Sequence, residues 1–191
     1  MTAAPNMSLY TCRGPGSPVP IDLALPNAGL GAPPPPDPAV LAQQALAQMG
    51  LHAIEIGIVP KPGSNSVGLV GMPTWMWVAD PGESTTGPIT RTASKAGYTV
   101  SATASVRKIV WHMDDGHSVV CEGEGTPYED AYGKRSSPTC GHTYSKQGRY
   151  VVSATSYWQV VWGGIGQTGV INLDFTADAA INVGEAQVIV R

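Results

Sequence analysis

Alternation of apolar and polar side chains dominates the chain after residue 51. Successive side chains of a β-strand point to opposite faces, so this alternation predicts strands with one buried face. Turn signals such as Asp115-Gly116 and Gly163-Gly164 separate the alternating stretches. Seven or more strands with turns between them predict an all-β fold, an antiparallel β-sandwich over residues 51–191. The predicted strands span residues 54–58, 74–78, 98–106, 108–113, 117–121, 149–162, 169–175 and 179–190.

A proline-rich segment precedes the predicted strands. Prolines recur through residues 1–36 and end in the run Pro33–Pro36. Proline removes a backbone donor and breaks helices, so we expect an extended, irregular arm in this segment. The apolar alternation at Ile21, Leu23 and Leu25 is compatible with one edge strand within it.

A single short helix is predicted over residues 37–50. Asp37 can accept hydrogen bonds from the free amides of a first helical turn, and Pro38 suits the first helical position. The following residues are rich in Ala, Leu and Gln, and Gly50 supplies a stop. A helix of about three turns is marginal on its own, so we expect it to pack against the β-rich region.

The charge balance excludes several classes of partner. The formal net charge is -3, and Lys and Arg together number 11 in 191 residues. A basic surface that holds nucleic-acid phosphates and a polybasic patch for anionic membranes are therefore excluded. No run of 18 apolar residues is present to span a bilayer. Residues 1–12 lack the pattern of a signal peptide, so the chain is either cytosolic or the mature part of an exported protein.

The cysteines favour an exported protein. Cys121 and Cys140 bracket a polar segment, and a disulfide between them would contribute about 3 kcal/mol of stability. Such bonds persist in oxidising compartments, which predicts an extracytoplasmic location, secreted or associated with the cell envelope. Two isolated thiols in a cytosolic protein are the alternative. Cys12 is left over, and it is free, paired between chains or partnered in a longer precursor.

Two separated motifs carry a resemblance to the polycystic-kidney-disease (PKD) type domain. The chain reads Trp-His-Met-Asp-Asp-Gly over residues 111–116, and later Pro-Thr-Cys-Gly-His-Thr-Tyr over residues 138–144. That family has a Trp-x-Phe-Gly-Asp-Gly hairpin followed by Pro-x-His-x-Tyr and a Tyr-x-Val strand. Met113 here replaces the family's aromatic residue, and Asp114 replaces its first glycine.

The PKD resemblance implies an immunoglobulin-like β-sandwich and gives the motif residues structural roles. Trp111 is expected to point into the core, and Asp115-Gly116 is expected to make the hairpin turn. The polar tips of His142 and Tyr144 are expected to bond backbone groups at a corner of the sandwich.

A second resemblance, to uncharacterised exported proteins of actinobacteria, covers most of the chain. It rests on the stretches 37–45, 72–77 and 184–188, together with the hairpin and the Cys-Gly-His-x-Tyr segment. Some of those proteins carry the label "ATP/GTP-binding protein". The residues here do not support nucleotide binding, because Tyr128 stands where a phosphate-binding loop needs its first glycine and Arg135 where it needs a hydroxyl.

Three polar groupings have side chains that can carry chemistry. His112, Asp114, Asp115 and His117 lie within six residues, but no further anchor is visible, so a solvated hairpin without metal is expected. Cys140-Gly-His142 resembles a thiol–imidazole pair, but a disulfide would remove the nucleophile. The remaining grouping consists of loop carboxylates with no sign of a cleft between them: Glu122, Glu124, Glu129 and Asp130. We therefore expect that this protein has no enzymatic activity and binds no metal and no cofactor.

Four tryptophans define the candidate binding surface. Trp75 and Trp77 share one strand face, and Trp158 and Trp162 share another. One such face is expected in the core, and an exposed one would be an aromatic platform for sugars or proteins. The predicted function is a non-enzymatic module that mediates protein or cell-surface contacts, with a carbohydrate-binding module as the alternative. A curved Trp strip would favour sugar, and an unpaired edge strand or flat apolar patch would favour a protein. The sequence leaves open whether a longer precursor carries a membrane tether.

Overall fold

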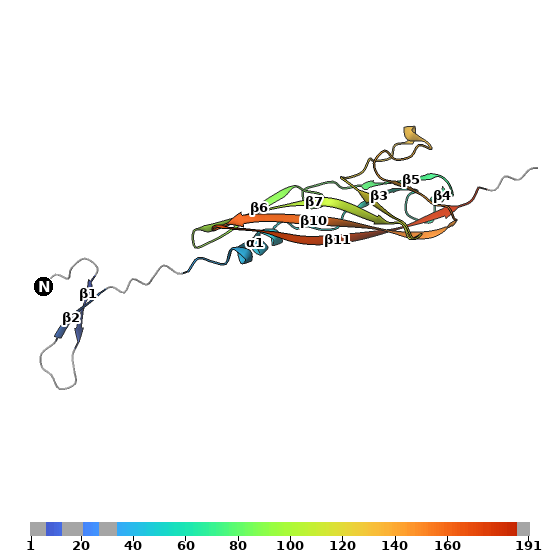
Figure 1. Ribbon diagram of the computed structural model, residues 1–191. Helices are drawn as coiled ribbons and strands as arrows, with labels where there is room; N and C mark the ends of the chain where they lie inside the picture. Colours follow the sequence, from blue (N-terminus) through green and yellow to red (C-terminus); the bar gives the residue numbers. More distant parts are fainter. Residues whose placement is uncertain (1–6, 13–20, 27–33, 187–191) are drawn as a thin grey trace, which may run out of the picture. The chain divides into compact units, whose positions relative to one another are not determined.

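The computed structural model describes residues 7–12, 21–26 and 34–186, and it is mostly β, with 51% in strands against 8% in helices (Figure 1). The prediction of an all-β chain with one short helix is confirmed at this level. The chain forms two compact units, residues 1–35 and residues 36–191, which are described separately. No helix within the described ranges is long and apolar enough to cross a membrane.

The first unit contains an antiparallel hairpin. β1 (Met7–Cys12) pairs with β2 (Ile21–Pro26), with Met7 opposite Pro26. The expectation of an irregular arm with at most one strand was therefore wrong for these residues. Pro26 is the last residue of β2, where a missing backbone donor is tolerated. The rest of the arm up to residue 33 lies outside the described residues.

The second unit begins with the predicted helix. α1 (Pro38–Ala47) starts after Asp37, whose Oδ1 accepts a hydrogen bond of 2.9 Å from the backbone N–H of Ala39. Gly50 follows in the left-handed region at φ 60°, as a helix stop requires. The buried face of the helix and the turn after it packs against a sheet and consists of Leu41, Ala42, Ala45 and Met49.

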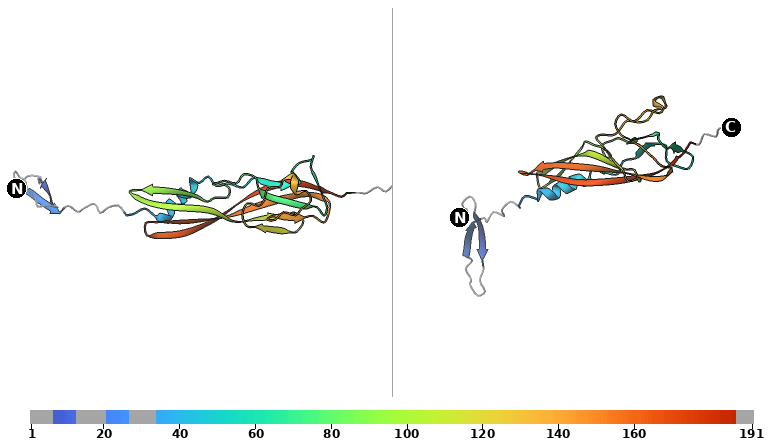
Figure 2. Two further views of the ribbon diagram at one scale, coloured as in Figure 1. Left: turned by 90° about the horizontal axis from the view of Figure 1, so that it is seen from above. Right: turned by 45° about the vertical axis from the view of Figure 1, so that its right-hand side comes forward.

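The strands of this unit form two sheets (Figure 2). All pairings are antiparallel except that of β4 with β11. The smaller sheet has the order β3 (Ile56–Val59), β5 (Pro73–Val78), β9 (Gly141–Thr143). The larger sheet has the order β4 (Val67–Leu69), β11 (Gln167–Gly184), β10 (Gly148–Gly164), β7 (Tyr98–His112), β6 (Ile89–Lys95), and β8 (Ser118–Cys121) also pairs with β7.

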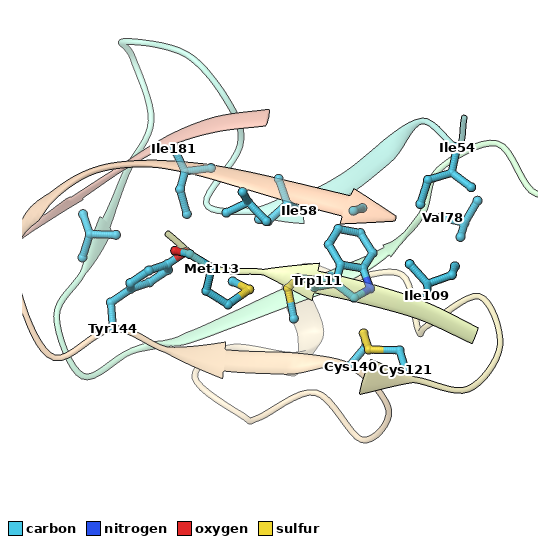
Figure 3. Close-up of a cluster of buried hydrophobic side chains, with 14 residues drawn as sticks. Ile54, Ile58, Val78, Ile109, Trp111, Met113, Cys121, Cys140, Tyr144 and Ile181 are labelled. Carbon is cyan, nitrogen blue, oxygen red and sulfur yellow. A yellow bond between two sulfur atoms is a disulfide. The ribbon is translucent and has the colours of Figure 1, made fainter. Parts of the chain in front are cut away.

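One face of the larger sheet has two different covers. Near one end it packs against the smaller sheet, where Val152 and Ala154 of β10 join a buried cluster (Figure 3). Near the other end it packs against α1, where Trp158, Val160 and Trp162 of the same strand face join a second cluster. The unit therefore has two hydrophobic cores side by side along the same strands.

A β-bulge explains why β7 looks like two strands in the sequence. Val106 lies opposite Trp158 and Lys108 lies opposite Tyr157, so Arg107 is an extra residue in β7. An extra residue reverses the alternation, and for this reason residues 98–106 and 108–113 follow opposite parities. The structure joins these two predicted strands into one strand that keeps a single inner face.

The two helix positions Leu41 and Val40 offer a matched test of the second core. Leu41 is 1% exposed and Val40 is 53% exposed. We expect Leu41→Ala to lower the free energy of unfolding by about 2–4 kcal/mol, because it leaves a cavity under α1. Val40→Ala should change it by less than about 0.5 kcal/mol. Urea unfolding followed by circular dichroism measures both, and equal losses would mean that α1 does not seal this core.

Candidate functional site

The hairpin between β7 and β8 forms the turn that the sequence predicts. Gly116 has φ 89° and Asp114 has φ 59°, both in the left-handed region. Aspartate tolerates this region better than most residues, which is why it can replace glycine at position 114. The Oδ2 atom of Asp114 also accepts a hydrogen bond of 2.8 Å from the backbone N–H of Val151. The turn is thereby tied to β10.

Asp115 lies between two histidines. Its Oδ2 is 2.7 Å from Nε2 of His142, which comes from β9. Its Oδ1 is 3.2 Å from Nδ1 of His117 and accepts a hydrogen bond of 3.1 Å from the backbone N–H of His117. The side chains of Asp115 and His142 are 14% and 12% exposed, whereas that of His117 is 70% exposed. One carboxylate is therefore shared by an inner and an outer imidazole.

The surroundings of Asp115 favour its ionised form. Burial raises the pKa of this carboxyl, but hydrogen bonds from His142 and from the backbone of His117 outweigh that effect. The net result is a pKa below the ordinary value of aspartic acid.

Tyr144 anchors the segment that carries His142. It is 1% exposed, and its hydroxyl donates a hydrogen bond of 2.9 Å to the backbone carbonyl of Met113. This is the kind of backbone contact that the sequence predicts for it. The ring of His142 packs edge-on against the ring of Tyr144, with 4.8 Å between the ring centroids. The Nε2 atom of His142 contacts the carboxylate of Asp115, whereas the sequence predicts a backbone group. Burial, reinforced by the nearby Asp115 charge, raises the pKa of Tyr144, so the hydroxyl stays protonated.

The four hairpin residues considered as metal ligands do not form one group. His112 lies outside the group, because its Nδ1 is 2.8 Å from Oγ of Ser118. Asp114 also lies outside it, because its carboxylate bonds the backbone of β10. His142 enters the group, so the ligand atoms of Asp115, His117 and His142 all lie within 4.8 Å of one another. Sequence reasoning missed this grouping because it gave His142 a corner role. The sequence signal that could have revealed this grouping is that the Asp-Gly and His-x-Tyr segments belong to one motif.

A disulfide joins Cys121 to Cys140, with their Cα atoms 5.7 Å apart. It closes the loop of residues 122–139, and that loop covers the outer face of the smaller sheet at Trp75. The indole of Trp75 stacks on Tyr132 at 4.9 Å, and its Nε1 donates a hydrogen bond of 2.7 Å to the carbonyl of Arg135. The loop thus buries an outward-facing tryptophan.

The four candidate tryptophans do not form an exposed strip, and the expectation that one of their faces lies in the core is met by Trp158 and Trp162. Trp75 lies under the disulfide loop, and Trp158 and Trp162 lie under α1, with exposures of 2%, 2% and 9%. Trp77 is partly exposed and packs across Gly57, where a Cβ would overlap its ring. The covers come from segments distant in the sequence, so strand alternation could not reveal them.

The loop carboxylates and Cys140, the other candidates for chemistry, do not gather at one site. The four loop carboxylates are exposed, and Glu124 accepts a hydrogen bond of 2.9 Å from the hydroxyl of Thr86. A mostly apolar cavity of about 350 Å³ lies beside β4, and of these acids only Asp130 lines it. Cys140 is bonded to Cys121 and is therefore no nucleophile.

β11 presents a long open edge. It pairs with β10 along its whole length, but with β4 only at its last three residues, 182–184. No described strand pairs with its other edge over residues 167–181. Its inner-face residues Ile171, Leu173 and Phe175 are only partly buried.

Comparisons with family models, with curated proteins and with solved structures found no match to this chain.

Removing the disulfide should loosen the unit of residues 36–191. The bond links residues 19 apart, so the Cys121→Ala/Cys140→Ala double variant should lose about 3 kcal/mol of unfolding free energy. Cys12→Ser belongs to the other unit and serves as the matched control, with no change expected. Urea unfolding in the absence of reductant measures both. A double variant as stable as the wild type would show that the bond contributes nothing.

Asp115 should make stability depend on pH. Because its folded pKa is depressed, its stabilisation is complete above about pH 4 and is lost as pH falls through the folded pKa. Asp115→Asn should therefore cost about 1.5–3 kcal/mol near neutral pH, and this difference should shrink in acid. Urea unfolding with a chelator present, from about pH 7 to about pH 3, measures it. Asp130→Asn, in the exposed loop, is the control, and a pH-independent difference would contradict the role of the Asp115 charge.

Proposed function

We propose that this chain is a non-enzymatic binding or scaffolding module that acts outside the cytoplasm, and that its partner is a protein. We propose further that an extended segment of this partner pairs with the open edge of β11. The open edge over residues 167–181 is the observation that carries the proposal.

An open strand edge is a template for another strand. Its unpaired N–H and C=O groups can be met by an added strand, which gives affinity through the main chain. Half-covered Ile171, Leu173 and Phe175 would gain contacts with the partner's side chains. The opposite edge of the sheet, β6, is shorter and carries Arg91 and Lys95, as edges protected from pairing commonly do.

The charges on β11 indicate the chemistry of the partner. Asp174 and Asp178 are exposed on the outer face of the strand. Lys or Arg side chains at the facing positions of an added strand would pair with these carboxylates. A second copy of β11 would bring like charges near one another. The partner segment we propose is therefore extended, with β-branched or aromatic residues alternating with basic ones.

The location and the finer fold assignment rest on other observations. A disulfide-bonded cysteine pair is typical of proteins in oxidising compartments, which supports an extracytoplasmic location. The buried Trp111, the turn at Gly116 and the hydroxyl contact of Tyr144 support a PKD-like, immunoglobulin-like sandwich. The carbohydrate-binding alternative needs an exposed aromatic strip, and the burial of Trp75, Trp158 and Trp162 makes these side chains unsuitable for one.

Selection from a displayed peptide library against the intact protein tests the proposed interface. We expect enrichment of extended basic–apolar sequences. On binding, the backbone amide signals of residues 167–181 should shift in NMR spectra, and their hydrogen exchange should slow. Asp174→Lys/Asp178→Lys should weaken binding of the selected peptides by about tenfold or more.

Glu122→Lys/Glu129→Lys is the matched control, because it makes the same change of charge on the exposed loop. Binding of the selected peptides should be unchanged in this variant. Signal changes confined to other strands, or equal losses in the two double variants, would overturn the β11 interface. Protease accessibility of the tagged protein on intact cells tests the location, and full protection would count against it.

A further inference from the structure

The Asp115–His117–His142 cluster brings together ligand atoms from two segments that the chain order separates. Asp115 and His117 lie on the turn after β7, and His142 lies on β9. One nitrogen of each imidazole and one carboxylate oxygen all lie within 4.8 Å of one another. The rings of His117 and His142 are 5.6 Å apart between centroids.

The spacing of these atoms suits a small transition-metal ion. Zinc binds imidazole nitrogen and carboxylate oxygen at about 2.0–2.2 Å, which places tetrahedral ligand atoms about 3.3 Å apart. Nε2 of His142 and Nδ1 of His117 are 2.7 and 3.2 Å from the oxygens of Asp115. An ion would replace the hydrogen bonds between these atoms. The two nitrogens are at most 4.8 Å apart, so a rotation of the exposed His117 side chain would bring them to the spacing of a tetrahedral site.

The ligands differ in how firmly they are held. His142 is nearly buried and packs edge-on against Tyr144, and the backbone N–H of His117 orients Asp115. The imidazole of His117 is the most exposed, so it is the group that can swing to close the site. His142 and the backbone N–H of His117 already give each carboxylate oxygen of Asp115 one hydrogen bond. The imidazole of His117 is therefore not required to hold the Asp115 side chain in place.

We propose that Asp115, His117 and His142 bind a divalent transition-metal ion, with zinc as the best match. Two imidazoles with one carboxylate suit Zn²⁺, Ni²⁺ or Cu²⁺, whereas Ca²⁺ and Mg²⁺ prefer oxygen ligands alone. Three protein ligands leave a coordination position for water or for a group of a partner. This site is separate from the edge of β11 and does not depend on the function proposed for that edge.

Calorimetric titration of the tag-free chain tests the site. The protein is stripped with a chelator and carries Cys12→Ser, so that this thiol adds no second metal ligand. We expect one Zn²⁺ per chain and no comparable binding of Ca²⁺ or Mg²⁺. His117→Ala should weaken Zn²⁺ binding by at least about tenfold. This variant should fold normally because the side chain is exposed.

His112→Ala is the matched control, since His112 is an exposed histidine on the same hairpin and outside the cluster. It should bind Zn²⁺ like the parent. As a second readout, Co²⁺ should give the visible absorption of a tetrahedral site in the parent and in His112→Ala, and lose it in His117→Ala. Absence of Zn²⁺ binding, or equal weakening by His112→Ala and His117→Ala, would overturn the proposal.

Discussion

The continuous inner face of β10 is the constraint on which the rest of residues 36–191 depends. Every second residue from Val152 to Trp162 is buried along a strand of 17 residues. The smaller sheet covers one part of this face, and α1 covers the other part. The bulge at Arg107 lets β7 contribute apolar side chains to both cores. Burial of this face therefore sets the positions of the helix, the bulge and the smaller sheet.

The same arrangement positions the cluster around Asp115. β7 delivers the hairpin turn to the end of the sheet that carries the smaller sheet, and β9 belongs to that smaller sheet. The disulfide connects the end of β8 at Cys121 with Cys140, two residues before His142. A covalent bond thus holds together the two segments that supply the cluster. The loop that this bond closes also covers Trp75 on the outer face of the smaller sheet. One disulfide therefore holds both the segments of the Asp115 cluster and the cover over Trp75.

Local patterns predicted the elements whose signals are local. The cap at Asp37, the stop at Gly50 and the turn at Gly116 act within a few residues, and each is present. β6 was missed because the short stretch after Pro88 has only two buried residues, Ile89 and Ala93. The predicted gap within β11, between residues 175 and 179, was wrong because Ala177 continues the alternation.

Long-range covers could not be predicted in the same way. Nothing near Trp75 or Trp158 in the sequence shows that a loop and a helix will bury them. The place of His142 beside Asp115 likewise depends on how β9 lies against the hairpin turn, which is a property of the assembled sheets.

The path of the chain through residues 36–191 has a mechanical consequence. α1 lies at the end where β10 and β11 meet in their hairpin, and β11 leaves the sheet at the opposite end beside β4 (Figure 2). A strand of 17 residues is roughly 55 Å long. Tension between Pro36 and Gly184 would run parallel to these strands. At the Gly184 end it would load the hydrogen bonds between β11 and β10 in shear, and at the Pro36 end it would load the side-chain packing of α1 on the sheet.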